Sequence, residues 1–112
     1  MFEVERLGFL SVVAVPRRLN VTHVRGLVEC VRAELAEHPR AIVLDLRGTD
    51  AIDMAGLAGI VEMHKHCANR GVQLRLSAPR QAVRRLLGIT RLDRALHLDE
   101  GTAEGGLSAA AE

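Results

Sequence analysis

Apolar residues near the start of the chain follow the spacing of β-strands. Residues 9–15, FLSVVAV, predict a strand that Pro16 ends, and the preceding MFEVERL predicts another, so the two strands suggest a hairpin. Further along, residues 41–44 are apolar without alternation, as in a strand that is covered on both faces. We therefore expect residues 41–44 to form a central strand of a sheet.

Two later segments also predict strands. In residues 72–78, VQLRLSA, apolar and polar positions alternate. The expected inward side chains are Val72, Leu74 and Leu76, and the expected outward side chains are Gln73, Arg75 and Ser77. A short last strand is expected around residues 95–98.

The first helix has the clearest pattern in the chain. It is expected from residue 21 to about residue 37, because apolar side chains recur there every three or four positions. These side chains are Val24, Leu27, Val28, Val31 and Leu35. Asn20 or Thr22 can cap its start, and His38-Pro39 ends it, because a residue before proline is disfavoured in helical geometry.

Two more helices follow. The second is expected from about Met54 to Asn69, where the residues Asn69-Arg70-Gly71 are typical of a helix stop. The third begins near Pro79, which suits a first helical turn, and extends over about ten residues. Its apolar face is expected to carry Ala82, Val83, Leu86 and Leu87.

The order of these elements, β-β-α-β-α-β-α-β, predicts a single α/β domain with right-handed crossovers. We expect a central mixed β-sheet of four to five strands with three or four helices, and 112 residues suffice for one such domain. The domain is assigned to residues 1–99, and a disordered tail is expected at residues 100–112, where large apolar groups are scarce. Binding sites in such sheets collect at the C-terminal ends of strands, which places residues 49–56 at the functional edge.

Composition and charge narrow the classes of function. The net charge is +1, the cations are fourteen scattered arginines and one lysine, and two phenylalanines are the only aromatic residues besides histidine, so we expect no nucleic-acid partner. The chain lacks both a run of about 18 apolar residues and the features of a secretory signal, so we expect no membrane insertion and a cytoplasmic location. Cys30 and Cys67, an isolated pair, fit a reducing compartment.

Several linked pieces of the sequence resemble the STAS domain, and in particular the bacterial anti-sigma factor antagonists, across about residues 9–99. The pieces are the strand IVLDL, the acid-x-x-Gly-Leu pattern from Asp53 to Leu57, Arg70-Gly71 before a strand, Pro79 with VRRLL, and TRLDRAL near the end. Their order and spacing agree with the fold expected from the residue patterns.

The resemblance implies a partner-switching protein rather than an enzyme. Members of this family typically have a serine at the position of Ala55, and often a second serine at that of Met54. An anti-sigma factor with a histidine-kinase-like ATPase domain phosphorylates the serine at the position of Ala55. The phosphorylated protein then releases the anti-sigma factor. Neither residue here has a hydroxyl group, so the resemblance implies an antagonist without the usual phosphoserine. Residues 17–20, RRLN, also depart from the common Gly-Glu-Leu-Asp, which inverts the charge of this loop.

The expected partner-binding residues lie at the same edge. They are Asn20, Thr49, Asp53, Met54, Ala55, Gly56, Leu57 and Gly59. Asp53 is expected to cap the second helix, whose first N–H groups and positive dipole end then face the partner. Thr22 and Thr49 are the remaining hydroxyl groups near this edge, and capping or turn roles are favoured over phosphorylation for both.

The histidine and cysteine residues could suggest a metal site or a redox site. His64, His66 and Cys67 are close in sequence, but on a helix His66 points away from the other two, and a zinc site needs about four converging ligands. A regulatory disulfide between Cys30 and Cys67 would need Cα atoms within about 7 Å, which the sequence does not show. We expect no metal and no cofactor.

Three carboxylates near one strand end could suggest acid–base catalysis or a magnesium site; they belong to Asp45, Asp50 and Asp53. A turn role for Asp50, a cap for Asp53, and backbone or arginine contacts for Asp45 fit better. No nucleophile with a base and no phosphate-binding glycine loop is present, so we expect no enzyme activity.

Three functions therefore remain open from the sequence. The first is an anti-sigma factor antagonist without a phosphorylation switch. The second is a STAS subunit of a transport complex that docks on an ATPase or a permease. The third is a small-ligand sensor with a nucleotide or lipid in the edge cleft. A homodimer is compatible with all three.

Overall fold

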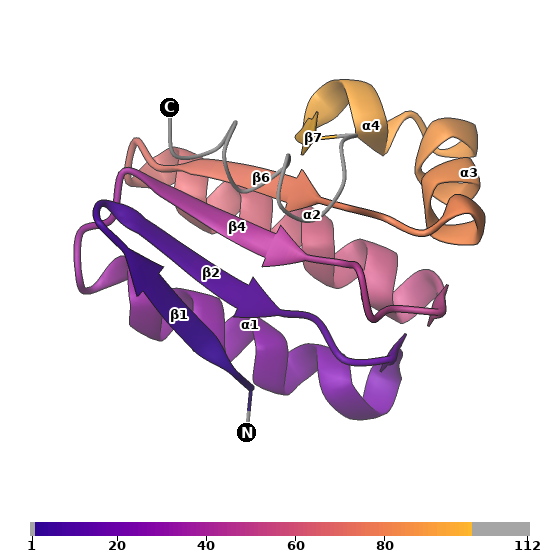
Figure 1. The fold of residues 1–112 in the computed structure, drawn as a ribbon, viewed down its shortest axis with the longest axis horizontal. Coiled ribbons are helices and arrows are strands. Elements are labelled where there is room, and N and C mark those ends of the chain that lie inside the picture. Colours follow the sequence, from indigo (N-terminus) through magenta and orange to yellow (C-terminus); the bar gives the residue numbers. More distant parts are fainter. Residues whose placement is uncertain (1, 100–112) are drawn as a thin grey trace.

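Strands and helices alternate along the chain as predicted, with three short elements added (Figure 1). The computed structural model describes residues 2–99. Its elements are β1 (Val4–Leu7), β2 (Leu10–Ala14), β3 (Arg18–Leu19), α1 (Val21–Leu35), β4 (Ala41–Asp45), β5 (Ala51–Ile52), α2 (Met54–Asn69), β6 (Gln73–Ser77), α3 (Gln81–Ile89), α4 (Leu92–Ala95) and β7 (His97–Asp99). The additions are β3, β5 and α4, and the tail expected at residues 100–112 lies outside the described residues.

Five strands form one mixed sheet in the order β1-β2-β4-β6-β7. β1 and β2 pair antiparallel as the predicted hairpin, and the other neighbours pair in parallel. β4 is central and all five of its residues are buried, which confirms the prediction for residues 41–44. The α/β class and the mixed sheet are therefore as expected from the sequence.

The main core fills the space between the sheet and the two long helices, which lie together on one of its faces (Figure 1). Leu27, Val28 and Val31 of α1 are fully buried, as are Ile60 and Met63 of α2. Alternate residues of a strand point to opposite faces, so Ile42 and Leu44 join this core while Ala41 and Val43 join a smaller apolar cluster with Leu10 and Val12. The predicted apolar face of α1 is confirmed.

The end of α1 differs from the sequence expectation. The helix stops at Leu35, two residues before Glu37, because the N–H groups of Ala36, Glu37 and His38 each bond the carbonyl three residues earlier in a tight turn. His38 then adopts a φ of +56°. The turn thus ends the helix before Pro39 is reached.

Two side chains on later elements also differ from expectation. Ser77, expected to face outward, is 1% exposed, and in the sheet register it lies between Asp45 of β4 and Asp99 of β7. Ala82, expected on the apolar face of α3, is exposed, because this helix contacts the core through Val83 and Leu87, which lie one turn apart.

Candidate functional site

A short parallel pair of strands brings the starts of α1 and α2 together. β3 and β5 pair Arg18 with Ala51 and Leu19 with Ile52. Each strand leads through one capping residue into a helix, so the first turns of α1 and α2 lie side by side at the C-terminal end of the sheet (Figure 1). We call the surface formed by Asn20, Val21, Asp53, Met54 and Ala55 the helix-start edge.

Asn20 and Asp53 cap the two helices, as the sequence predicts. The Asn20 side chain accepts hydrogen bonds from the N–H groups of Thr22 and His23, at 3.1 and 3.3 Å. The Asp53 carboxylate accepts one from the N–H of Gly56, at 2.8 Å. Neither first turn contains an acidic residue, so no further carboxylate offsets the positive ends of the helix dipoles.

The first residue of each helix is an exposed apolar side chain. Val21 is 73% exposed and Met54 is 78% exposed. Ala55 is partly buried and packs against the core. The helix-start edge therefore presents an apolar pair to solvent, and a complex that buried this pair would gain hydrophobic stabilisation.

Three of the predicted partner-binding residues lie inside the molecule instead. Gly56, Leu57 and Gly59 are buried, which corrects their expected place on the surface. A Cβ atom at Gly56 would overlap the carbonyl oxygen of Leu19, and one at Gly59 would overlap the side chain of Val24. The glycines thus allow α2 to pack closely against β3 and α1, and they position the edge rather than form it.

Thr49, another of the predicted partner-binding residues, also lies inside the molecule. It is fully buried, and its hydroxyl group donates to the carbonyl oxygens of Val15 at 3.3 Å and Pro16 at 3.0 Å. These two bonds tie the loop after β4 to the segment that follows β2. In this fold Thr49 is accessible neither to a partner nor to a kinase, whereas Thr22 is exposed.

Asp50 joins two arginines from distant loops, a contact that no local sequence pattern indicated. Its carboxylate accepts from Nε of Arg17 at 2.5 Å and from Nη1 of Arg80 at 2.6 Å. Arg80 Nε also donates to the carbonyl oxygen of Arg47 at 3.0 Å. The hydrogen bond from Arg17 is the main cause that lowers the pKa of Asp50, because it stabilises the ionised carboxylate.

The three carboxylates near the strand ends do not converge on one position. Asp45 accepts from the N–H of Arg47 at 3.1 Å and forms an ion pair with its guanidinium at 2.8 Å, as predicted. Asp50 and Asp53 are engaged by the arginines and by the cap. In the part of the chain that the structure describes, no group of three histidine, cysteine or acidic residues could hold a metal ion.

The histidine and cysteine residues of α2 have separate environments. His66 lies 3.4 Å from the Glu62 carboxylate, while His64 Nδ1 is buried without a hydrogen-bond partner among the described residues. Cys67 is fully buried, and burial raises the pKa of its thiol to about 11. Cys30 and Cys67 are both free thiols.

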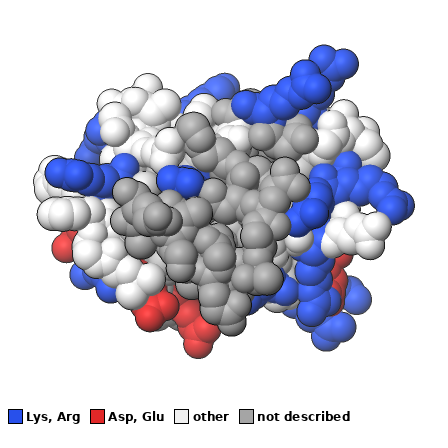
Figure 2. All heavy atoms as spheres, turned by 45° about the horizontal axis from the view of Figure 1, so that its top comes forward, with Lys and Arg blue, Asp and Glu red and all other residues white. Residues whose placement is uncertain are grey.

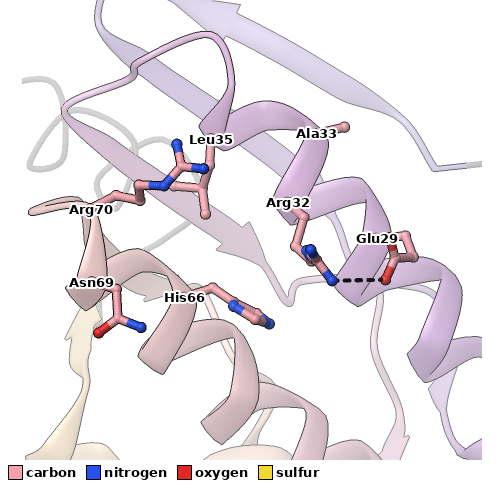
Figure 3. A pocket seen from close by; sticks show the side chains of 7 residues that line it. All are labelled: Glu29, Arg32, Ala33, Leu35, His66, Asn69 and Arg70. Carbon is pink, nitrogen blue, oxygen red and sulfur yellow. Dashed lines mark ion pairs between the residues drawn. The ribbon is translucent and has the colours of Figure 1, made fainter.

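A cavity of about 420 Å³ lies at the far end of the helices, between the last turns of α1 and α2 (Figure 3). Arg32, His66 and Arg70 line it together with Glu29. The small-ligand interpretation expected a cleft at the strand ends, whereas this cavity lies at the opposite ends of the helices.

Among the described residues, no helix is long and apolar enough to cross a membrane.

Comparisons with known proteins agree with the fold. The anti-sigma factor antagonist from Mycobacterium paratuberculosis superposes with a TM-score of 0.84 at 24% identity, over 100% of this chain and 94% of that chain. The STAS domain protein from Planctomyces limnophilus gives 0.81 at 19% identity, over 97% of both chains. SpoIIAA from Bacillus in its phosphorylated form gives 0.75 at 12% identity, over 98% of this chain and 99% of that chain.

At these identities the solved structures support the fold alone. A search of the curated proteins finds no match. The STAS domain family model matches residues 1–105. The chain therefore belongs to the STAS domain family.

Proposed function

We propose that this protein is an anti-sigma factor antagonist that binds its partner through the helix-start edge and lacks the phosphoserine switch. The observation that carries the proposal is the start of α2, where Met54 is 78% exposed and neither Met54 nor Ala55 has a hydroxyl group. The STAS fold and its similarity to anti-sigma factor antagonists of known structure support the choice of partner.

The chemistry of the edge suits a protein partner. Val21 and Met54 offer an exposed apolar surface on two capped helices, so little backbone conformational entropy is lost when they are buried. A phosphate group at this point would add about −1.5 to −2 charges and would have to be desolvated in the complex. Without a hydroxyl at positions 54 and 55, that route to release is closed.

The partner in this proposal is an anti-sigma factor with a histidine-kinase-like ATPase domain, and the protein acts by sequestering it in the cytoplasm without catalysing a reaction. The carboxylates at the strand ends are already engaged by arginines or by a helix cap, which leaves them unsuited to acid–base catalysis. The proposal involves neither nucleic acid nor a bound cofactor.

Affinity capture followed by calorimetry tests the proposal. The tagged protein and a Met54→Asp variant are used as baits in extracts of the native cell, and each captured protein is purified and titrated with both baits. We expect a sigma-regulating ATPase that binds the natural sequence and binds the variant much more weakly. A transport ATPase or permease would instead support a transport subunit, and the absence of any protein partner would support a ligand sensor.

A further inference from the structure

We propose that the helix-start edge recognises an acidic face on its partner, through two arginines, Arg17 and Arg80, which Asp50 holds in place beside it. This inference rests on the proposed function, since it names the chemistry of the partner that the same edge binds.

The arginines come from separate loops that the sheet brings together. Arg17 follows β2, Asp50 follows β4, and Arg80 follows β6, and these three strands are neighbours in the sheet. Asp50 directly precedes β5, which leads into α2, so the cluster borders the helix-start edge. The Arg17 and Arg80 side chains are 80% and 59% exposed, while that of Asp50 is 31% exposed.

Both guanidinium groups keep donors that no described residue uses. Arg17 binds Asp50 through Nε, which leaves Nη1 and Nη2. Arg80 uses Nε and Nη1, which leaves Nη2. A guanidinium carries five N–H donors and can bind a carboxylate through two of them at once. Because Asp50 already fixes both side chains, a partner carboxylate meets donors that are ordered in advance.

The carboxylates around the edge offset only part of this charge, because Asp50 neutralises one of its two arginines and the cluster keeps one net positive charge. Asp45 is engaged by Arg47, Asp50 by Arg17 and Arg80, and Asp53 by the start of α2. Figure 2 shows that Lys and Arg side chains outnumber acidic ones along the right side of the molecule, where α3 lies in Figure 1. Together with exposed Val21 and Met54, this gives an apolar centre beside a basic border, which complements an apolar recess bordered by Asp or Glu.

The cavity of Figure 3 also contains two arginines, but its surroundings are different. Arg32 lies 3.7 Å from Glu29 of the same helix. Arg32 and Arg70 lie at the C-terminal ends of α1 and α2, where the helix dipoles are negative and cations are favoured. Carboxylates should therefore prefer the helix-start edge, and Arg32 provides a matched control.

The first test measures affinity for the anti-sigma factor purified from the capture experiment. Arg17→Gln and Arg80→Gln should each raise Kd about tenfold at low salt and flatten its salt dependence, while Arg32→Gln, with the same charge change, should stay within about twofold. Equal effects in all three variants would mean that net charge alone determines the affinity, and this result would overturn the inference.

Asp50→Asn tests the positioning role of Asp50. If only charge mattered, removing an acid would tighten binding to an acidic partner. Loss of the ordered arginines should instead raise Kd in spite of the added positive charge. A lower Kd would overturn the role given to Asp50.

A second probe does not depend on the anti-sigma factor. Titration with a poly-L-glutamate of about 20 residues, followed by NMR, should shift the signals of Arg17, Met54 and Arg80 at a lower concentration than those of Arg32 and Arg70. The reverse order would overturn the inference.

The two proposals fail in different ways. A complex that Met54→Asp weakens but the arginine variants do not would overturn this inference and leave the proposed function. Poly-L-glutamate binding at the edge without any anti-sigma factor complex would support an acidic partner and overturn the proposed function.

Discussion

The carbonyl oxygen of Leu19 lies against the backbone of Gly56, and this contact holds the first turn of α2 close to β3. The same register places Asp53 N–H 3.1 Å from that carbonyl oxygen. The carbonyl group of Leu19 therefore contacts both the capping residue Asp53 and the first turn of α2 at Gly56. The close approach of α2 to β3 therefore requires glycine at position 56.

Gly56→Ala should destabilise the protein by about 1 to 3 kcal/mol, because the added methyl group overlaps backbone atoms that cannot move without breaking the β3–β5 pair. Urea unfolding measures the change. Gly48→Ala is the matched control, since a Cβ atom there meets nothing within 4 Å, and it should change the free energy of unfolding by less than about 0.5 kcal/mol. Similar values for the two variants would show that α2 starts elsewhere.

Val28→Ala should cost about 1 to 3 kcal/mol of unfolding free energy, since Val28 is fully buried between α1 and the sheet and the change leaves a cavity. The control is the same substitution on the same helix at Val21, which is 73% exposed and should change stability by about 0.5 kcal/mol or less. If the Val21 variant is the less stable of the two, the orientation of α1 is wrong.

The sequence specified local features well because their signals lie in neighbouring residues. The bounds of α2, the caps at Asn20 and Asp53, and the buried face of α1 follow from spacing and residue type within one segment. The helix α1 ends two residues before the position that the sequence predicts. The tight turn at Ala36 forms through backbone hydrogen bonds, which no side-chain pattern indicates.

The missed features depend on residues that are far apart in the chain. β3 and β5 have two residues each, which is too short to show a period, and they pair across 33 positions. Thr49 looks like an exposed turn residue until Val15 and Pro16, which follow β2, supply carbonyl acceptors for its hydroxyl group. The sequence suggested a turn role for Asp50, while its arginine partners appear only when three loops meet.

Met54→Asp should weaken the anti-sigma factor complex by about 2 kcal/mol or more, a factor of about thirty, because a charge at the centre of the interface loses its hydration. The fold should survive, since Met54 is 78% exposed and an acid in the first turn of a helix is favourable by about 0.3 to 1 kcal/mol. Met54→Asn, which removes the apolar side chain without adding charge, is the control for titration calorimetry. Unchanged affinity for the aspartate variant would move the interface elsewhere.

Ala55→Ser should make the complex sensitive to ATP, because it supplies a hydroxyl acceptor in the first turn of α2. After incubation with the purified partner and ATP, mass spectrometry should find phosphate on the variant peptide of residues 53–59. The natural peptide has no hydroxyl side chain and should stay unmodified. A variant that binds normally but is never phosphorylated would contradict a kinase partner.

Glu34 should make stability depend on acid pH. Its side chain is 9% exposed, and the carboxylate accepts from Arg6 at 3.0 and 3.2 Å and from the Ser11 hydroxyl at 2.8 Å. The hydrogen bonds from Arg6 are the main cause that lowers the pKa of Glu34 below its ordinary 4.5. The stabilisation is therefore complete above about pH 4.5, the unfolded value, and is lost as the pH falls through the lower folded value.

Glu34→Gln should accordingly lower the free energy of unfolding by about 1 to 3 kcal/mol at neutral pH, and the difference from the natural sequence should shrink below about pH 4. Glu37→Gln is the control: its ion pair with Arg6 is 3.8 Å long and both side chains are 56% exposed, so the change should cost about 0.5 kcal/mol or less. A difference for Glu34→Gln that is constant over this pH range would mean that its ionisation is not coupled to folding.

The contact of the Asp50 carboxylate with two other loops also affects how this protein can evolve. Arg17, Asp50 and Arg80 lie on separate segments, yet a substitution at Asp50 removes a hydrogen bond from both arginines at once. A change at Asp50 therefore alters the surface of all three loops, whereas a change at Arg17 leaves the bond between Asp50 and Arg80 in place. Binding preference at this end of the sheet should therefore be most sensitive to substitution at position 50.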